Sequence, residues 1–440
     1  MPYISNIIFA IILIYAIFLF SKNIRSIVRN INMGKPIDRS DQPTKRWGNV
    51  IRIALGQSKM LNRPISGILH IIVYLGFVVI NIELIEIVLD GLLGTHRLFA
   101  PYMGSMYNVL IATFEVFAAL VLISVVILWL RRNALELKRF RKPELKGWSK
   151  KDADYILYFE LILMTLFLSM NATDSLLQER NEPHYIQAGL FPVSQFIAPV
   201  FSSISVTTLV ILERTFWWLH ITGILIFLNY LYYSKHLHII LAFPNTYFQN
   251  LNPLGTFRNN KTVTDEIKLM MDDPSADLYP APEGNVVNKF GASDVTDLNK
   301  VQLLNAYTCT ECGRCTDVCP ANQTGKLLSP RKIMMDTRDR LEEVGKNTPK
   351  NEPFKPDGKQ LLKYYISSEE LWACTSCNAC VEACPIGIDP LSIIMDMRQY
   401  LVMEQSAAPD DLNNMMSNIE NNGAPWPFSN QDRMLWTKDN

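Results

Sequence analysis

One cysteine pattern occurs twice in this chain, as Cys309-Thr-Glu-Cys312-Gly-Arg-Cys315-Thr-Asp-Val-Cys319-Pro320 and as Cys374-Thr-Ser-Cys377-Asn-Ala-Cys380-Val-Glu-Ala-Cys384-Pro385. The two runs contain all eight cysteines of the 440 residues. Three thiolates in one tight loop can bind three iron corners of a cubane, and the fourth corner needs a ligand from elsewhere. The spacing therefore predicts two [4Fe–4S] clusters, with the last cysteine of each run binding the cluster of the other run.

This rule assigns the ligands. The first cluster is expected on Cys309, Cys312, Cys315 and Cys384, and the second on Cys374, Cys377, Cys380 and Cys319. Two other uses of eight cysteines fit less well. Disulfides need an oxidising compartment, whereas the charge pattern described below places this part of the chain inside the cell. Structural zinc sites usually take paired C-x2-C knuckles rather than a triplet with a distant fourth ligand.

The composition divides the chain into an apolar and a polar half. The formal net charge is zero, so charge gives no reason to expect a nucleic-acid partner. Hydrophobic residues make up 49% of the chain, and the long apolar runs all lie before about residue 240. We expect a membrane domain at 1–242, a linker at 243–290, a cluster domain at 291–405 and a tail at 406–440.

Five apolar runs have the length of transmembrane helices, at about 4–21, 65–90, 106–130, 154–176 and 211–234. A sixth run, about 193–209, is interrupted by Pro192 and Pro199, and we expect a helix that lies at the surface or folds back. The first run has no basic residue before it and no small-residue cleavage site after it, so it is expected to be an uncleaved anchor.

Lysine and arginine predict the orientation. Segment 21–63 carries ten of them and segment 131–153 carries nine, whereas 91–105 and 171–210 carry one each. By the positive-inside rule, the N-terminus lies outside and the cluster domain lies in the cytoplasm. The expected location is the inner (cytoplasmic) membrane.

Two histidines are expected at the inner level of the membrane. His70 lies near the inner end of the second span, and His238 closes the fifth. Imidazoles from two helices at one depth are what axial ligation of a haem b requires. The alternative for each histidine is a hydrogen-bonded helix contact. Arg63 and Lys235 lie close enough in sequence to contact the haem propionates, or else to act as ordinary positive-inside anchors.

A second haem at the outer level lacks a ligand pair. His220 precedes His238 by 18 residues, which is five turns or about 27 Å in a continuous helix. The matching position on the second span is near Ile80, which cannot bind iron. His96 and His184 in the outer loops are weak substitutes. The sequence therefore predicts one haem.

Acidic residues gather toward the outer half of the same spans. They are Glu83, Glu86 and Glu115. Carboxylates at membrane depth are costly and often mark proton or substrate routes. We expect them to form a quinone site together with His220. The alternative is that Glu83 and Glu86 lie solvated among the outer headgroups.

The polar half is expected to be mostly helical. Helices are predicted at about 297–308, 329–343, 358–373 and 390–405, and Ser367 with Glu370 forms a capping box. The tail carries the aromatic residues Trp426, Phe428 and Trp436 as well as three prolines, which is typical of either a partner-docking segment or a disordered end. The predicted fold class is an all-α membrane bundle of five transmembrane helices, followed by a mostly helical ferredoxin-like domain with two [4Fe–4S] clusters.

The assembled motifs resemble known families. The chain resembles membrane-anchored, heterodisulfide-reductase-like iron–sulfur oxidoreductases. Its anchor is similar to the haem-b subunit of respiratory nitrate reductase, on the segments Gly67-Ile-Leu-His70-Ile-Ile-Val-Tyr-Leu-Gly76-Phe77 and Tyr233-Ser-Lys-His-Leu-His238. The soluble half looks like electron-transfer-flavoprotein:menaquinone oxidoreductases, on Ala306-Tyr-Thr-Cys309, Pro320-Ala-Asn-Gln-Thr-Gly325 and Trp372-Ala-Cys374.

The resemblance implies an electron-transfer subunit that links a soluble donor, an electron-transfer flavoprotein, to menaquinone through two clusters and haem b. Such families usually carry a Cys-Cys-Gly domain, and this sequence has no further cysteine. We therefore expect that domain on a partner subunit, docked near the clusters and on the tail. One alternative is a membrane-bound redox sensor or assembly factor without quinone turnover. Another is the same electron-transfer chain serving a different dehydrogenase or a disulfide reductase.

Overall fold

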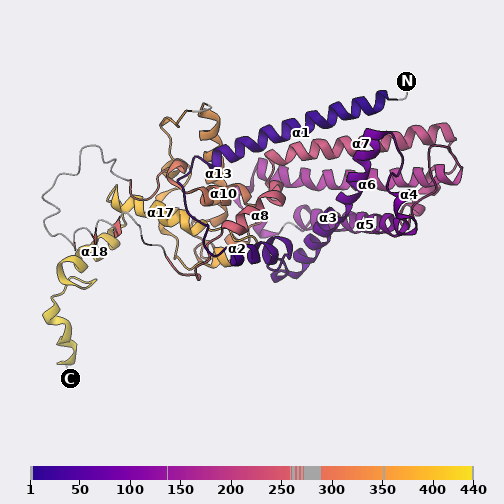
Figure 1. Cartoon of the computed structure of the whole chain (residues 1–440). Coiled ribbons are helices and arrows are strands. Elements are labelled where there is room, and N and C mark those ends of the chain that lie inside the picture. Colours follow the sequence, from indigo (N-terminus) through magenta and orange to yellow (C-terminus); the bar gives the residue numbers. More distant parts are fainter. Residues whose placement is uncertain are drawn as a thin grey trace.

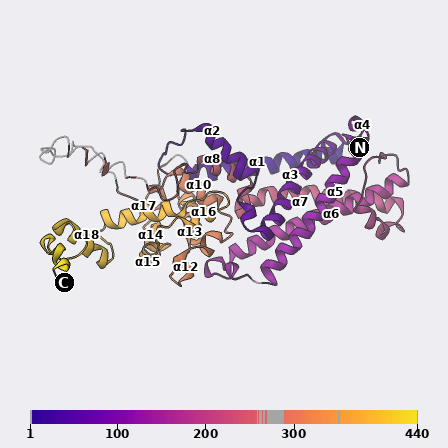
Figure 2. The ribbon, with the colours of Figure 1, turned by 90° about the horizontal axis from the view of Figure 1, so that it is seen from below.

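The computed structural model describes residues 3–135, 137–257, 259, 263–264, 267–268, 271, 289–349 and 352–438. The molecule is elongated (Figure 1). A bundle of long helices forms one end, a helical cluster domain follows, and the last helices project at the other end. The same order is seen from below (Figure 2). Within the described residues the chain contains only helices, turns and two isolated β-bridges.

The five predicted spans are confirmed as helices long and apolar enough to cross a membrane. Within the described chain they are α1 (Ile4–Ile31), α3 (Pro64–Leu93), α5 (Ser105–Asn133), α6 (Trp148–Glu179) and α7 (Val206–Tyr230), the last extended by a 3-10 turn to Tyr233. A helix forms hydrogen bonds between its own backbone N–H and C=O groups, and this is necessary in lipid because no water is present to bond them. α3 begins with Pro64, and Gly94, with φ of 75°, follows its last residue. Proline is common at the first position of a helix, and glycine is common directly after its end.

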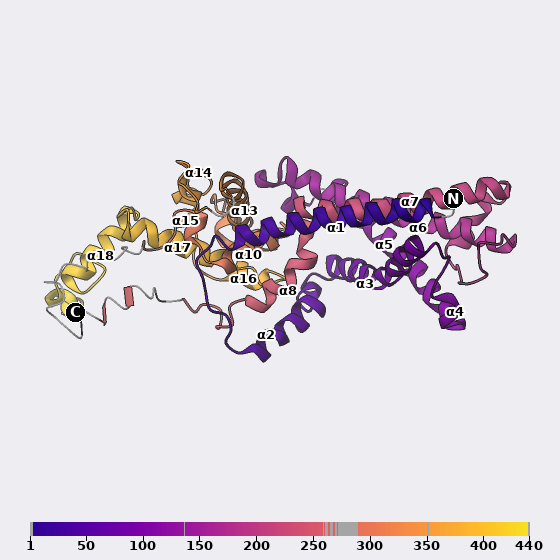
Figure 3. The same cartoon turned by 45° about the horizontal axis from the view of Figure 1, so that its top comes forward.

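The bundle has a central and a peripheral helix. α6 packs against both α5 and α7, and α3 packs against α5. In the most apolar stretch of each helix, 50% of the residues of α6 are buried inside the protein, but only 11% of those of α1. α1 therefore lies along the outside of the bundle, and Figure 3 shows it running from the far end of the bundle to the cluster domain.

The polar half is built around four helices: α8 (His238–Phe248), α10 (Lys300–Thr308), α13 (Pro330–Asn347) and α17 (Pro390–Met403). The other helices are α2 (Pro43–Asn49), α4 (Ala100–Met103), α11 (Arg314–Asp317), α12 (Pro320–Gln323), α14 (Leu361–Tyr364), α15 (Ser368–Trp372), α16 (Ala379–Ala383) and α18 (Asp410–Asn422). A π-helix covers Val50–Leu55, and a 3-10 helix at Asn430–Thr437 ends the described chain.

The two halves share one hydrophobic core. Ile27 of α1 and Phe227 of α7 belong to the same buried cluster as Leu303 and Ile393 of the cluster domain. Asn30 of α1 donates a hydrogen bond to the Tyr307 hydroxyl at 2.9 Å. Because side chains of both halves fill this core, the cluster domain is fixed against the end of the bundle that lies opposite to the N-terminus.

Three sequence expectations differ from the structure. The run 193–209 forms 3-10 turns at Ser194–Phe196 and Ala198–Phe201 before α7 begins, because its prolines interrupt a continuous helix. The helix expected at 358–373 is broken: Lys363 has φ of 74°, and only α15, with the predicted capping box, is regular. The expected domain boundary at 242/243 falls inside α8, which packs on α10. Most of the expected linker lies outside the described residues.

Candidate functional site

The eight cysteines lie in two loops of the cluster domain, and none of them forms a disulfide. α10 ends at Cys309, and the loop then passes through Glu311 and Gly313, with φ of 55° and 73°. A positive φ favours glycine at Gly313, and a Cβ there would lie 2.5 Å from a terminal nitrogen of the Arg331 side chain.

Cysteines of both runs lie close together. A cavity of about 20 Å³ is bordered by Cys309, Cys312, Cys315 and Cys384, with Cys380 also at its edge. Cys319, from the first loop, lies within electrostatic range of the second-loop thiols Cys374 and Cys380. The fourth cysteine of each run thus lies beside the triplet of the other run.

The thiols differ in burial: Cys309, Cys319 and Cys380 are buried, whereas Cys377 is exposed. Burial raises the pKa of Cys309 to about 12 and that of Cys384 to about 11, so at neutral pH each thiol keeps its proton until a metal displaces it. The amide of Ser376 donates to Sγ of Cys374 at 3.4 Å, and the amide of Ile388 donates to Sγ of Cys384 at 3.3 Å. Such hydrogen bonds are among the features that set the potential of an iron–sulfur cluster.

His70 and His238 face each other at the same level, with ring centres 6.4 Å apart. Two imidazoles that bind one metal from opposite sides, with bonds of about 2.0 Å, have ring centres about 6 Å apart. Nδ1 of His238 lies 3.2 Å from the carbonyl of Lys235, which leaves Nε2 for a metal. Nδ1 of His70 is buried without a partner. The separation of the two rings is therefore that of two imidazoles bound to one metal ion.

The path of the chain to His238 differs from the expected continuous helix. After α7 the backbone becomes extended at Ser234, with φ of −114° and ψ of 144°, and His238 opens α8 instead of closing the fifth span. The five-turn relation between His220 and His238 therefore does not hold. The ring centres of His236 and His238 lie 5.4 Å apart. Burial lowers the pKa of His236 to about 3 and also lowers that of His238, so both rings are neutral.

The first cluster loop contacts the histidine segment directly. Nζ of Lys235 lies 2.5 Å from Oε2 of Glu311, which stands between Cys309 and Cys312. The other oxygen of Glu311 accepts from Arg338 at 2.8 Å. Sequence reasoning missed Glu311; its one signal was an acidic side chain inside a cysteine loop.

Arg63 and Lys235, the expected propionate contacts, are occupied elsewhere. Arg63 pairs with Asp317 of the first loop at 2.5 Å, and Lys235 also bonds the carbonyl of Ser149 at 2.6 Å. Arg314 donates to the carbonyl of Lys59, just before α3, at 3.1 Å. These basic side chains join the cluster loops to the adjoining end of the bundle.

The residues expected at the outer site divide into two groups. Glu83 and Glu86 line a cavity of about 270 Å³ at the end of the bundle opposite to the cluster domain. His220 is buried one turn inward, with Nδ1 3.0 Å from the carbonyl of Leu163. Glu115 accepts from the amides of Val193 and Ser194 at 2.8 and 3.0 Å, so it anchors the segment that follows α6.

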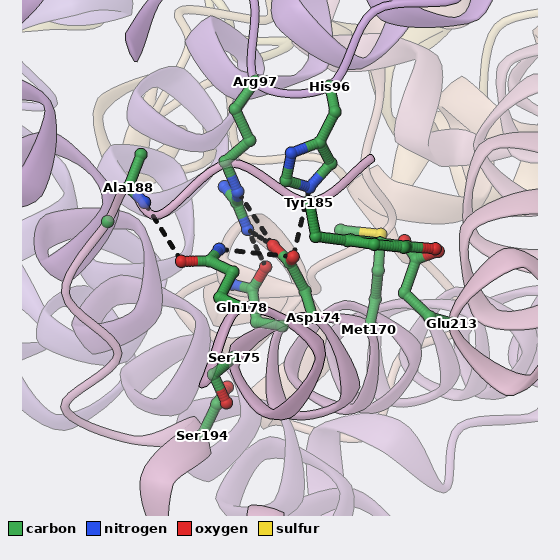
Figure 4. A network of polar contacts seen from close by, with 12 residues as sticks. His96, Arg97, Met170, Asp174, Ser175, Gln178, Tyr185, Ala188, Ser194 and Glu213 are labelled. Carbon is green, nitrogen blue, oxygen red and sulfur yellow. Dashed lines mark hydrogen bonds and ion pairs between the residues drawn. The ribbon is translucent and has the colours of Figure 1, made fainter. Parts of the chain in front are cut away.

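A buried polar network, unexpected from the sequence, forms one wall of this cavity (Figure 4). Arg97 donates twice to Asp174, at 2.9 and 2.7 Å, and His96 lies 3.1 Å from the same carboxylate. Tyr185 donates to Glu213 at 2.8 Å. Arg97 is the single arginine in its outer loop, and that rarity was the only sign of a structural role.

Comparison with known proteins identifies the cluster domain. Residues 308–388 match the 4Fe-4S dicluster domain family. The chain is 29% identical to "Probable iron-sulfur-binding oxidoreductase FadF" of Bacillus subtilis, over 98% of this chain and 60% of that protein. It is 26% identical to "EtfAB:quinone oxidoreductase" of Syntrophomonas wolfei, over 91% of this chain and 55% of that protein.

A shorter match, 31% identical over 34% of this chain, is to "Probable membrane-anchored ferredoxin" of Chromohalobacter salexigens, of which it covers 24%. The chain thus spans little more than half the length of the first two relatives. No solved structure matches it significantly. These matches show a chain that is similar to iron–sulfur oxidoreductases and contains a 4Fe-4S dicluster domain, and its described residues include five helices long and apolar enough to cross a membrane.

Proposed function

We propose that this chain is the electron-transfer part of a membrane oxidoreductase that links a soluble donor to menaquinone. The observation that carries the proposal is the contact between the first cysteine loop and the histidine segment, through Glu311 and Lys235. This contact joins the two groups of metal-binding side chains within one packed core. When bound, two [4Fe–4S] clusters and a haem b supply one-electron redox chemistry at these positions.

The cysteines hold the clusters in the crossed arrangement. Cys309, Cys312, Cys315 and Cys384 bind one cluster, and Cys374, Cys377, Cys380 and Cys319 bind the other. The cavity bordered by the first set, and the closeness of Cys319 to Cys374, support this assignment. His70 and His238 hold the haem, supported by the separation of their rings.

A visible spectrum tests the haem. The purified full chain is expected to show a reduced haem-b spectrum at about one haem per chain. His70→Ala and His238→Ala should each abolish it, because one axial ligand is lost. His220→Ala is the matched control and should keep it, since that ring faces Leu163 and Phe167 of α6. A wild-type chain with iron–sulfur absorption but no haem would contradict the assignment.

The donor side is proposed to face the cytoplasm, at the inner membrane, with the N-terminus outside. The excess of lysine and arginine in segments 21–63 and 131–153 supports this orientation. An electron-transfer flavoprotein is the proposed donor, and a Cys-Cys-Gly-type iron–sulfur subunit is the proposed intermediary. The relationship to a protein named EtfAB:quinone oxidoreductase supports the flavoprotein.

The tail is the proposed docking segment for this partner. α18 has no buried residue, and the aromatic side chains Trp426, Phe428 and Trp436 are 49 to 74% exposed. Acidic side chains open α18, which disfavours an anionic lipid surface. A chain truncated after residue 405 should keep its cluster spectrum and lose affinity for the partner; unchanged affinity would contradict the docking role.

A further inference from the structure

The outer cavity is formed where α1, α3, α7 and the Arg97 loop meet, at the end of the bundle that carries the N-terminus (Figure 1). Its volume is about 270 Å³, and it is open to the outside of the molecule. Phe9 of α1 packs on Trp217 and Trp218 of α7, with ring centres 5.4 and 6.1 Å apart. The cavity therefore combines an aromatic wall with the polar wall of Figure 4.

One carboxylate in this cavity lacks the partners that the others have. Glu83 is 2% exposed, and its Oε2 is buried without any hydrogen bond. Its Oε1 lies 3.6 Å from Arg97, whose shorter contacts, at 2.9 and 2.7 Å, go to Asp174. A buried carboxylate oxygen without a partner is costly unless it carries a proton or meets a ligand.

The other two glutamates of the expected quinone site are fully engaged. Glu86 accepts from the Phe99 amide at 2.8 Å and from the Tyr107 hydroxyl at 2.7 Å. Glu115 is bonded through both oxygens as well. Among these three glutamates, only Glu83 has an oxygen left for an exchangeable proton or a substrate.

Glu83 is also the cavity residue of α3 nearest to the histidine pair. It follows His70 by 13 residues on the same helix, about 20 Å along the axis. A ring bound at Glu83 would therefore lie at the inner floor of the cavity, on the side from which electrons come.

We propose that this cavity binds the quinone head group and that Glu83 is the carboxyl that exchanges a proton with it. This inference rests on the proposed function. Reduction of one quinone takes two electrons, supplied by the reduced clusters, and two protons. As the electrons arrive, the O–H bond of the Glu83 carboxyl breaks and an O–H bond forms on a quinone oxygen. Water in the open cavity reprotonates Glu83 and supplies the second proton, so protons enter at the end opposite to the clusters.

The test uses the purified full chain with its clusters reduced by dithionite and then mixed with menadione, a short naphthoquinone. Reoxidation is followed by the cluster absorbance. Glu83→Gln should slow it by about 100-fold or more, the usual contribution of a positioned acid. Glu83→Asp keeps a carboxyl and should restore part of the rate. Glu179→Gln, at an exposed position at the same end of the bundle, should leave the rate unchanged.

Binding is measured separately, by quenching of tryptophan fluorescence with menadione, because Trp217 and Trp218 line the cavity. The Glu83→Gln variant should keep its affinity within about tenfold, since an amide still forms an ordinary hydrogen bond. A Glu83→Gln rate equal to that of wild type, with intact cluster absorbance, would overturn the inference and leave the proposed function standing. If menadione fails to reoxidise even the wild-type chain, the proposed function falls and the inference with it.

Discussion

Glu311 holds Lys235 at 2.5 Å across the boundary between the cluster domain and the membrane bundle. Their side chains are 2% and 9% exposed, so this ion pair is buried. Through its own carbonyl, Lys235 also accepts from Nδ1 of His238 at 3.2 Å. One lysine thus connects the loop between Cys309 and Cys312 to a proposed haem ligand.

Lys235→Met should destabilise the chain. The substitution leaves the Glu311 carboxylate buried with Arg338 as its one remaining cation, and breaking a buried pair typically costs about 3–5 kcal/mol. Thermal unfolding of the purified protein measures the loss. Lys346→Met is the control, because its pair with Glu342 is exposed and such pairs contribute less than about 1 kcal/mol. Equal stability losses in the two variants would contradict a structural role for the buried pair.

The crossed ligation predicts which cluster each fourth cysteine serves. Cys384→Ser should disturb the cluster of the first loop, and Cys319→Ser that of the second, because each serine replaces a thiolate beside the opposite triplet. Electron paramagnetic resonance of the reduced variants checks this, since each should retain one undisturbed cluster signal and the two retained signals should differ. If Cys384→Ser instead disturbed the second-loop cluster, the assignment would be reversed.

The stability of the cluster domain should depend on pH through Asp336. Burial raises the pKa of this carboxyl to about 6, above its ordinary value of about 3.9. The folded chain therefore holds a proton that the unfolded chain has lost, so this contribution to stability is present below about pH 4 and declines as the pH rises to about 6.

The Asp336→Asn substitution removes the carboxyl group that takes up this proton. Between pH 5 and pH 7 the free energy of unfolding of wild type should fall more than that of Asp336→Asn. Asp410→Asn, on the exposed α18, should follow wild type. An identical pH dependence of Asp336→Asn and wild type would show that Asp336 does not take up this proton.

Local patterns predicted much of the architecture. The five spans follow from runs of apolar residues, and the capping box of Ser367 was readable because it lies within four residues. The cysteine spacing likewise indicated 4Fe–4S clusters, in agreement with the match of residues 308–388 to the 4Fe-4S dicluster domain family, whereas the assignment of each thiol to a cluster stays a prediction. In each case a short stretch of chain contains the whole cause.

Contacts between distant segments could not be predicted in the same way. The break at Ser234 places His236 beside His238, and no periodicity signals it. Lys235 and Glu311 are 76 residues apart in the sequence, and Arg97 and Asp174, which also form an ion pair, are 77 residues apart. The fusion of α1 with the cluster-domain core depends on where a long helix ends in space, which its apolar composition does not specify.

The most direct test is the iron and acid-labile sulfide content of the anaerobically purified full chain. Two [4Fe–4S] clusters predict about eight sulfides per chain, and about eight irons plus one for the haem. A chain with all eight cysteines unchanged that contained neither iron nor sulfide, or that contained zinc instead, would contradict the assignment of the two clusters.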